Sequence, residues 1–145
     1  MTPFERAQKS ADVMFADDMA SAWMGFHIAS VDEGRATLTM VVVPHHCNGH
    51  GMCHGGVIFA LADSAFAFAC NSRNQRTVAQ HNVISYIASG RLGDVLAAEA
   101  TDVSLTGRSG IYDVTITNQD GVIIAEFRGM SRAIRGTLFD EEEPS

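Results

Sequence analysis

Residues 48–71 read NGHGMCHGGVIFALADSAFAFACN, and this stretch decides how the rest of the chain folds. Its first part is rich in glycine and histidine, so the backbone can make turns and close approaches that side chains would forbid. From Val57 to Cys70 it becomes an apolar run of helical length with one charged residue, Asp63. A helix that is apolar on all sides is a buried helix. We therefore expect a central helix wrapped by the remaining chain.

The composition indicates one ordered domain. The chain has 145 residues, of which 46% are hydrophobic, so it can bury one core but not two. We expect a single domain over residues 1–136 and an acidic, solvated tail over residues 137–145. The formal net charge of −7 argues against a nucleic-acid partner, because such a partner requires a basic surface.

The sequence also predicts a cytoplasmic protein that does not associate with membranes. No apolar run reaches the roughly 20 residues of a spanning helix, and the first residues do not resemble a signal peptide. The cysteines, Cys47, Cys53 and Cys70, share no C-x-x-C spacing, which fits a reduced compartment better than a disulfide framework.

The segments around the central helix predict an α+β fold. Thr2 and Glu5 match a capping box, and apolar residues recur at helical spacing from Phe4 to Trp23, which predicts one amphipathic N-terminal helix. Strands are expected at residues 36–42, 77–87, 95–105, 111–117 and 122–134. Because most strands follow the helix without helices between them, we expect a curved antiparallel sheet around it.

The loop before the central helix also suggests a metal site. Possible zinc or copper ligands occur at His45, His46, Cys47, His50, Cys53 and His54. Their spacing matches no established signature, and we regard His45 and His46 as ordinary surface residues. We therefore predict no metal. The glycine spacing is also one residue too long for a dinucleotide-binding loop.

The start of the helix and its carboxylate offer hydrolytic chemistry. The backbone N–H groups of Gly55 and Gly56 have no acceptor within the helix, so they can polarise a carbonyl group. Asp63, in apolar surroundings, should be a stronger base than a solvated aspartate. Gly56 and Asp63 lie about 10 Å apart along the helix axis, too far to act on one carbonyl. A site shared between two antiparallel helices of a dimer resolves this.

A purely structural role for Asp63 is the alternative. The carboxylate could be satisfied by Ser64, by Asn48 or by a backbone donor. No Ser-His-Asp or Cys-His spacing is visible, and the phenylalanines of the helix are expected in the core.

Three segments resemble a known family. NGHGMCHGG at residues 48–56 and FALADSAFAFACNS at residues 59–72 resemble the hotdog-fold thioesterases, specifically those of phenylacetic acid degradation, the PaaI type. IYDVTITNQDGVIIAEFRG at residues 111–129 is also similar. The resemblance implies the hotdog fold, with a homodimer that assembles into a homotetramer.

The resemblance also implies a reaction and roles for residues. The substrate would be an acyl-CoA thioester, phenylacetyl-CoA or a ring-hydroxylated relative, hydrolysed without metal or organic cofactor. Asp63 would be the general base or the nucleophile. The N–H of Gly55, with Gly56 beside it, would polarise the thioester carbonyl. Asn48 and His54 would position substrate or water.

One departure from the family concerns the binding of CoA. The family usually has Arg-Pro-Gly where this chain has Ala88-Ser89-Gly90, although Arg91 follows. A non-catalytic acyl-CoA-binding or interaction module on the same fold is the second hypothesis. A hotdog dehydratase is a weaker third hypothesis. Dehydratases of this fold usually pair a His with an Asp or Glu across the site, and the H-G-G of this chain lies elsewhere.

Overall fold

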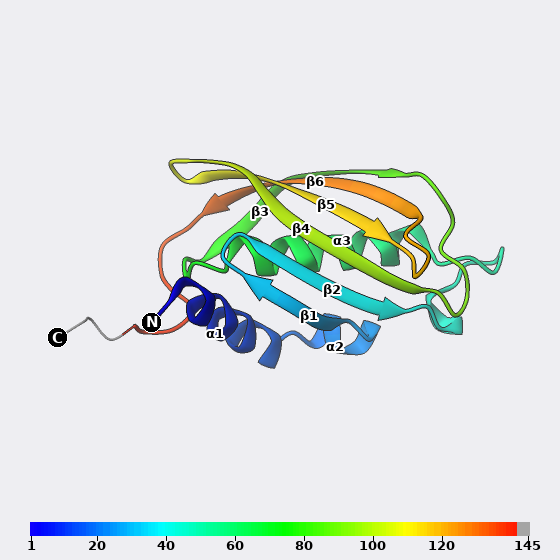
Figure 1. Cartoon of the computed structure of the whole chain (residues 1–145), viewed down its shortest axis with the longest axis horizontal. Coiled ribbons are helices and arrows are strands. Elements are labelled where there is room, and N and C mark those ends of the chain that lie inside the picture. The colour runs from blue at the N-terminus through cyan, green and yellow to red at the C-terminus, as the bar shows by residue number, and fades with distance from the viewer. Residues whose placement is uncertain (142–145) are drawn as a thin grey trace.

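One long helix, α3 (Gly55–Cys70), lies under a curved antiparallel sheet of six strands (Figure 1). This computed structural model describes residues 1–141. The strands, in the order in which they lie in the sheet, are β1 (His27–Asp32), β2 (Arg35–Val41), β4 (Val95–Thr106), β5 (Ser109–Thr117), β6 (Ile123–Ala133) and β3 (Thr77–Tyr86). All neighbouring pairs are antiparallel. The predicted α+β arrangement, a helix wrapped by a curved sheet, is confirmed.

The core lies between α3 and the inner face of the sheet. Alternate residues of the central strands point inward, since side chains of a strand alternate between its faces. The inward residues of β4 and β5 are Leu96, Ala98, Ala100, Tyr112, Val114 and Ile116, all buried. They meet Leu61, Phe66 and Phe68 of α3. None of the helices in the described part of the chain has the length and hydropathy to span a membrane.

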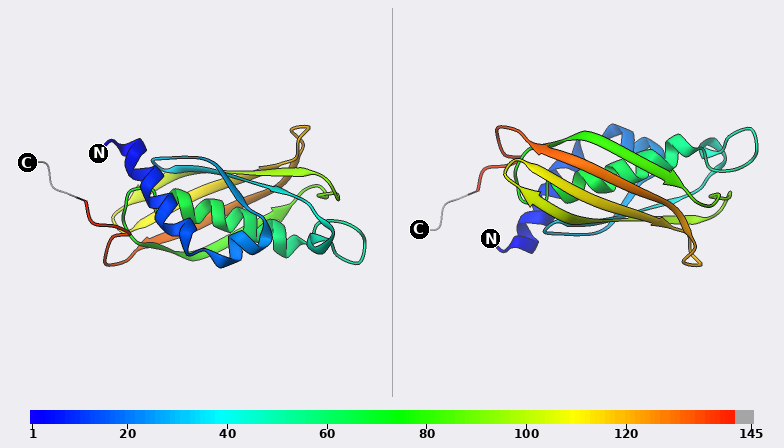
Figure 2. Two further views of the ribbon diagram at one scale, coloured as in Figure 1. Left: turned by 90° about the horizontal axis from the view of Figure 1, so that it is seen from below. Right: turned by 90° about the horizontal axis from the view of Figure 1, so that it is seen from above.

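The N-terminal segment forms two helices where the sequence predicted one. They are α1 (Pro3–Ala16) and α2 (Met19–Met24), and both lie on the same face of the sheet as α3 (Figure 2). The carboxylate of Asp18 accepts a hydrogen bond from the backbone N–H of Ser21 at 2.9 Å, so it caps a new helix and ends the first. Met19 and Trp23 are 80% and 75% exposed, so the apolar stripe does not continue through α2.

The segment after β6 is bound to the domain up to residue 141. The side chain of Asn74 accepts from the backbone N–H groups of Leu138 and Phe139, and Arg6 pairs with Glu141. This part of the predicted tail is therefore not freely solvated. The rest of the predicted tail, residues 142–145, lies outside the described residues, and the domain division at residue 136 stays a prediction.

Gly129 of β6 gives a stability prediction. A Cβ atom there would lie 2.9 Å from ring atoms of Phe66, a fully buried side chain of the core. Gly129→Ala is therefore expected to lower the free energy of unfolding by about 1–3 kcal/mol, measured by chemical denaturation. Gly49→Ala is the control, because a Cβ there meets nothing within 4 Å. Equal stability of the two variants would contradict the prediction.

Candidate active site

The glycine-rich loop is held in shape by Asn48. Its side-chain oxygen accepts hydrogen bonds from the backbone N–H groups of His50 at 2.9 Å and Met52 at 3.3 Å. The turn also requires a left-handed conformation at Gly51, whose φ is +75°. Asn48 thus stabilises the loop that leads into α3.

His54 caps the N-terminus of α3. Its ring nitrogen Nδ1 accepts a hydrogen bond from the backbone N–H of Gly56 at 2.9 Å. That N–H group is therefore engaged, which differs from the expectation that Gly55 and Gly56 both face a substrate. Among the described residues, no acceptor is found for the N–H of Gly55, which remains at the positive end of the helix dipole. Gly55 is thus the candidate carbonyl-polarising donor.

Tyr86, at the end of β3, fixes the position of Gly55. Its hydroxyl group donates to the carbonyl oxygen of Gly55 at 2.8 Å. A Cβ atom at Gly55 would lie 3.1 Å from the ring of Tyr86. The tyrosine therefore leaves room only for glycine unless it moves. The sequence alone does not indicate this contact, because Tyr86 lies 31 residues away along the chain.

Asp63 is half-buried in the middle of α3, and its hydrogen-bond partner is Asn82 of β3. The amide nitrogen of Asn82 donates to Asp63 Oδ1 at 3.0 Å. The partners considered from sequence, Ser64 and Asn48, are not the ones used. Burial raises the pKa of Asp63 above its ordinary value, and the bond from Asn82 opposes part of this shift. Asp63 is thus a stronger base than a solvated aspartate.

The amide oxygen of Asn82 is buried and has no hydrogen-bond partner among the described residues. Buried polar atoms are usually satisfied, and exceptions mark places where a water or a ligand binds. This unpaired acceptor lies on the residue that contacts Asp63. The surroundings of Asp63 and Asn82 are therefore a candidate binding place for a small hydrogen-bond donor.

Asp63 and Gly55 of one chain do not converge. They are eight residues apart on one helix, which corresponds to about 12 Å along its axis. The structure brings Asn48, His54 and Gly55 together at one end of α3 and leaves Asp63 in its middle. One carbonyl cannot contact both groups of the same chain.

The histidines and cysteines of the loop do not form a metal centre in the described part of the chain. No group of three or more His, Cys, Asp or Glu side chains is placed to hold an ion. His46, expected at the surface, is buried, and its two ring nitrogens contact the N–H of Val43 and the carbonyl oxygen of Met24. This histidine serves the fold.

Arg91, the cation noted from sequence, lies next to the glycine-rich loop. Residues Met52 and Arg91 form an antiparallel bridge, and the N–H of Cys53 donates to the carbonyl oxygen of Gly90 at 2.8 Å. Asp94 accepts from the backbone N–H of Arg91 at 2.9 Å, which fixes the loop between β3 and β4.

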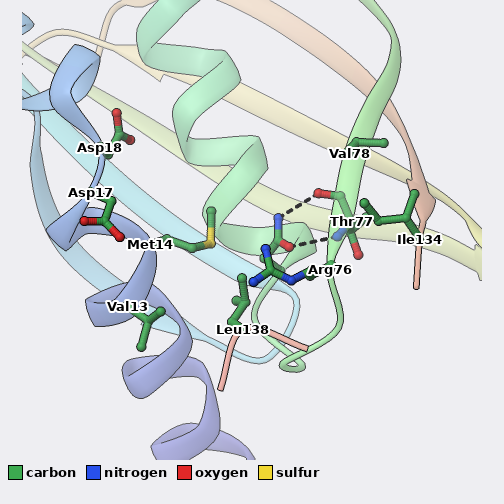
Figure 3. A pocket seen from close by; sticks show the side chains of 10 residues that line it. Val13, Met14, Asp17, Asp18, Arg76, Thr77, Val78, Ile134 and Leu138 are labelled. Atoms are coloured by element: carbon green, nitrogen blue, oxygen red, sulfur yellow. Dashed lines mark hydrogen bonds between the residues drawn. The ribbon is translucent and has the colours of Figure 1, made fainter. Parts of the chain in front are cut away.

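A cavity of about 430 Å³ lies beside the C-terminal end of α3, at the opposite end of this helix from the glycine-rich loop (Figure 3). Met14, Arg76 and Leu138 are among the residues that line it, and Asn71 joins the end of α3 to Thr77 beside it. Asp63 and Gly55 are not part of its lining. Our candidate for the active site is therefore Asp63 and its surroundings, because Asp63 combines a raised pKa with a hydrogen bond from Asn82.

Comparisons with known proteins identify the family. The family model described as the thioesterase superfamily matches residues 50–125, more than half of the chain. The chain is 41% identical over 136 residues to the acyl-coenzyme A thioesterase PaaI of Escherichia coli, covering 94% of this chain and 97% of that protein. The solved E. coli PaaI protein from the phenylacetic acid degradation operon matches with a TM-score of 0.92 at 40% identity, over 94% and 99% of the two chains.

A further solved structure carries a bound CoA ester. The protein smu.793 of Streptococcus mutans, bound to acetyl CoA, matches with a TM-score of 0.74 at 30% identity. The match covers 78% of this chain and 90% of that one.

The fold and the family match are those of a hotdog-fold thioester hydrolase. The chain belongs to the thioesterase superfamily. The resemblance drawn from residues 48–56 and 59–72 is thereby confirmed, and so is the prediction that the chain is an enzyme.

The contact between Asn82 and Asp63 predicts how activity depends on pH. Asp63 must be deprotonated to act as a base, so activity falls as the pH drops through its raised pKa. Asn82→Ala removes the hydrogen bond that lowers this pKa and is expected to move the acidic limb of kcat/KM to higher pH. Asn82→Asp should move it in the same direction, because a second carboxylate disfavours ionisation. An unchanged limb in both variants would contradict this role.

Proposed function

We propose that this thioester hydrolase acts on acyl-CoA thioesters with an aryl acyl group, of the phenylacetyl or hydroxyphenylacetyl type, and releases the free acid and CoA. The observation that supports hydrolysis is the half-buried Asp63, which accepts a hydrogen bond from Asn82, together with a Gly55 N–H that has no acceptor among the described residues. The similarity to the E. coli protein of the phenylacetic acid operon supports the aryl group. A cytoplasmic location stays a prediction from the sequence.

We assign Asp63 the role of general base. Its Oδ1 accepts from Asn82, which leaves Oδ2 to accept a proton from a water molecule. The oxygen of that water attacks the carbonyl carbon of the thioester. As the water attacks, its proton moves to Asp63, and the CoA thiolate leaves.

The carbonyl oxygen gains negative charge during this attack. A backbone N–H at a helix N-terminus stabilises such charge without reorganising, because the donor is already fixed. Gly55 provides that donor, Tyr86 holds it in place, and His54 caps the same helix end. Asn48 contributes by shaping the loop in front of it.

The active site is proposed to form between two copies of the chain. β3 is an edge strand of the sheet, and it carries exposed apolar residues such as Val78 and Val83. Long exposed edges with apolar residues pair readily with a second strand. Two β3 strands that pair about a two-fold axis place two α3 helices side by side and antiparallel.

One side of α3 is suited to such a pairing. Ala60 and Ala67 are small, half-buried and lie on the same side of the helix as Asp63. If the two-fold axis passes midway between Gly55 and Asp63, each Asp63 faces the Gly55 of the other copy. A homotetramer of two such dimers is the proposed assembly.

The proposed activity is tested by CoA release from a panel of thioesters. Phenylacetyl-CoA and hydroxyphenylacetyl-CoA are compared with short and long fatty acyl-CoAs, with a protein blank because the chain has its own cysteines. The expected result is faster release from the aryl esters. Binding of these esters in calorimetry without release of CoA would instead favour a non-catalytic binding module.

The role of Asp63 as base or nucleophile is tested by one turnover in ¹⁸O-labelled water. A base delivers labelled oxygen to the acid product in the first turnover, because water attacks the acyl carbon directly. A nucleophilic Asp63 forms an anhydride with the acyl group. If water then attacks the carboxyl carbon of Asp63, the label enters Asp63 and the first acid product is unlabelled. An unlabelled product would overturn the assignment as a base.

A further inference from the structure

Cys47 and Cys53 face each other across the base of the glycine-rich loop. They form an antiparallel bridge between the two arms of the loop. The flanking backbone hydrogen bonds run from Asn48 N to Met52 O and from His54 N to His46 O, both at 2.8 Å. The cysteines therefore occupy a non-hydrogen-bonded pair of the antiparallel pattern, whose side chains lie on the same side and approach closely.

This arrangement matches what a disulfide requires. The Cα atoms of a non-hydrogen-bonded pair lie about 4.5 Å apart, and disulfides join Cα atoms about 4.4–6.8 Å apart. The pair sits at the short end of this range, where the commonest separation is about 5.5–6 Å. A bond formed here is strained unless the two arms of the loop move apart by about 1 Å, and a strained bond is more easily reduced than a relaxed one.

The two thiols differ in accessibility. Cys47 is half-buried, and its thiol lies 3.7 Å from the carbonyl oxygen of Val43. Cys53 is buried against Gly90, and its pKa is raised to about 11 by burial and then by the neighbouring Cys47. Cys47 is therefore the thiol that meets a reagent first. Cys70 is buried at the far end of α3.

We propose that Cys47 and Cys53 form a reversible disulfide by exchange with a low-molecular-weight disulfide, and that this bond slows hydrolysis at the adjoining active site. The first part concerns only the two thiols. The second part rests on the proposed function.

The exchange takes place in two steps. The thiolate of Cys47 attacks one sulfur of the small disulfide, which forms a mixed disulfide and releases one small thiolate. Cys53 then loses its proton to solvent, and its sulfur attacks the sulfur of Cys47, which releases the second small thiol. Two protein thiols become one disulfide, and one small disulfide becomes two thiols.

The bond would disturb the site through its neighbours in sequence. Asn48 follows Cys47, and His54, the cap of α3, follows Cys53. Lengthening the Cα separation from about 4.5 Å toward about 5.5 Å moves these residues apart. A shift of about 1 Å at a catalytic group can cost up to about 10²-fold in rate. We expect kcat/KM to fall about tenfold or more on oxidation and to recover on reduction.

The experiment exposes the folded, reduced full-length chain to glutathione disulfide without denaturant. Intact mass, peptide mapping and CoA release are measured before and after, and again after dithiothreitol. The wild type and the control Cys70→Ser should lose two hydrogens and show the Cys47 to Cys53 link. Cys47→Ser and Cys47→Ala should form no link and keep their rate, and circular dichroism checks that each is folded.

The outcomes separate this inference from the proposed function. If the reduced protein hydrolyses CoA esters but Cys47 and Cys53 stay unlinked, the inference is overturned and the proposed function stands. A link that leaves the rate unchanged overturns the regulatory part. A link in a protein that hydrolyses no CoA ester even when reduced supports the thiol chemistry and overturns the proposed function.

Discussion

Asp63→Asn is expected to lower kcat/KM for an acyl-CoA thioester by about 10²–10⁴-fold, because the amide cannot accept the proton of the attacking water. The side chain keeps its shape and can still contact Asn82, so substrate binding should change far less than turnover. Steady-state kinetics with the preferred ester of the panel provides the measurement.

The stability of this variant separates catalysis from folding. The pKa of Asp63 is raised in the folded protein, so stability falls as the pH rises from the ordinary pKa of aspartate through the raised pKa, and the full cost is present above it. Asparagine removes this cost, and the variant should unfold at the same temperature as the wild type or higher at neutral pH. A folded variant with full activity would contradict the role of Asp63. Asp113→Asn, which changes an exposed carboxylate paired with Arg128, is the matched control.

Gly55→Pro is expected to lower kcat by about 10²–10³-fold relative to Gly55→Ala. A loss of this size is typical when one hydrogen-bond donor to the oxyanion is removed. Both substitutions add a Cβ atom near Tyr86, but only proline removes the backbone N–H. Proline is well tolerated at the first position of a helix. His54, with φ −59° and ψ 135°, already has the conformation that a residue before proline prefers.

The comparison of the two variants isolates the N–H group. Gly55→Ala reports the cost of crowding Tyr86, and the further loss in Gly55→Pro reports the missing donor. Thermal unfolding shows whether α3 is intact in both. Equal kcat values for the two variants would exclude the Gly55 N–H as the group that stabilises the oxyanion.

The fold was predictable because its signals are local. The apolar run of α3 identified a buried helix, and the alternation of strands such as residues 36–42 identified the sheet. The break between α1 and α2 was missed, since the apolar spacing continues through Met19 and Trp23 although both are exposed. The helix-capping chemistry of Asp18 outweighed that pattern.

The candidate site was predictable only in part. Asp63 and Gly55 stood out from sequence because a charge in an apolar helix and a glycine at a helix start each have a chemical reason. Asn82 and Tyr86 did not, because they reach α3 from a strand that is distant in the chain. The use of the Gly56 N–H by His54 depends on a side-chain rotamer that no spacing reveals.

The most direct test of a shared site uses two different chains in one dimer. Chains carrying Asp63→Asn and Gly55→Pro are co-expressed with different tags, and doubly tagged dimers are purified. In a site shared between copies, one of the two sites then combines an intact Asp63 with an intact Gly55, so about half of the wild-type rate is expected. A rate no higher than that of either parent variant would contradict the account.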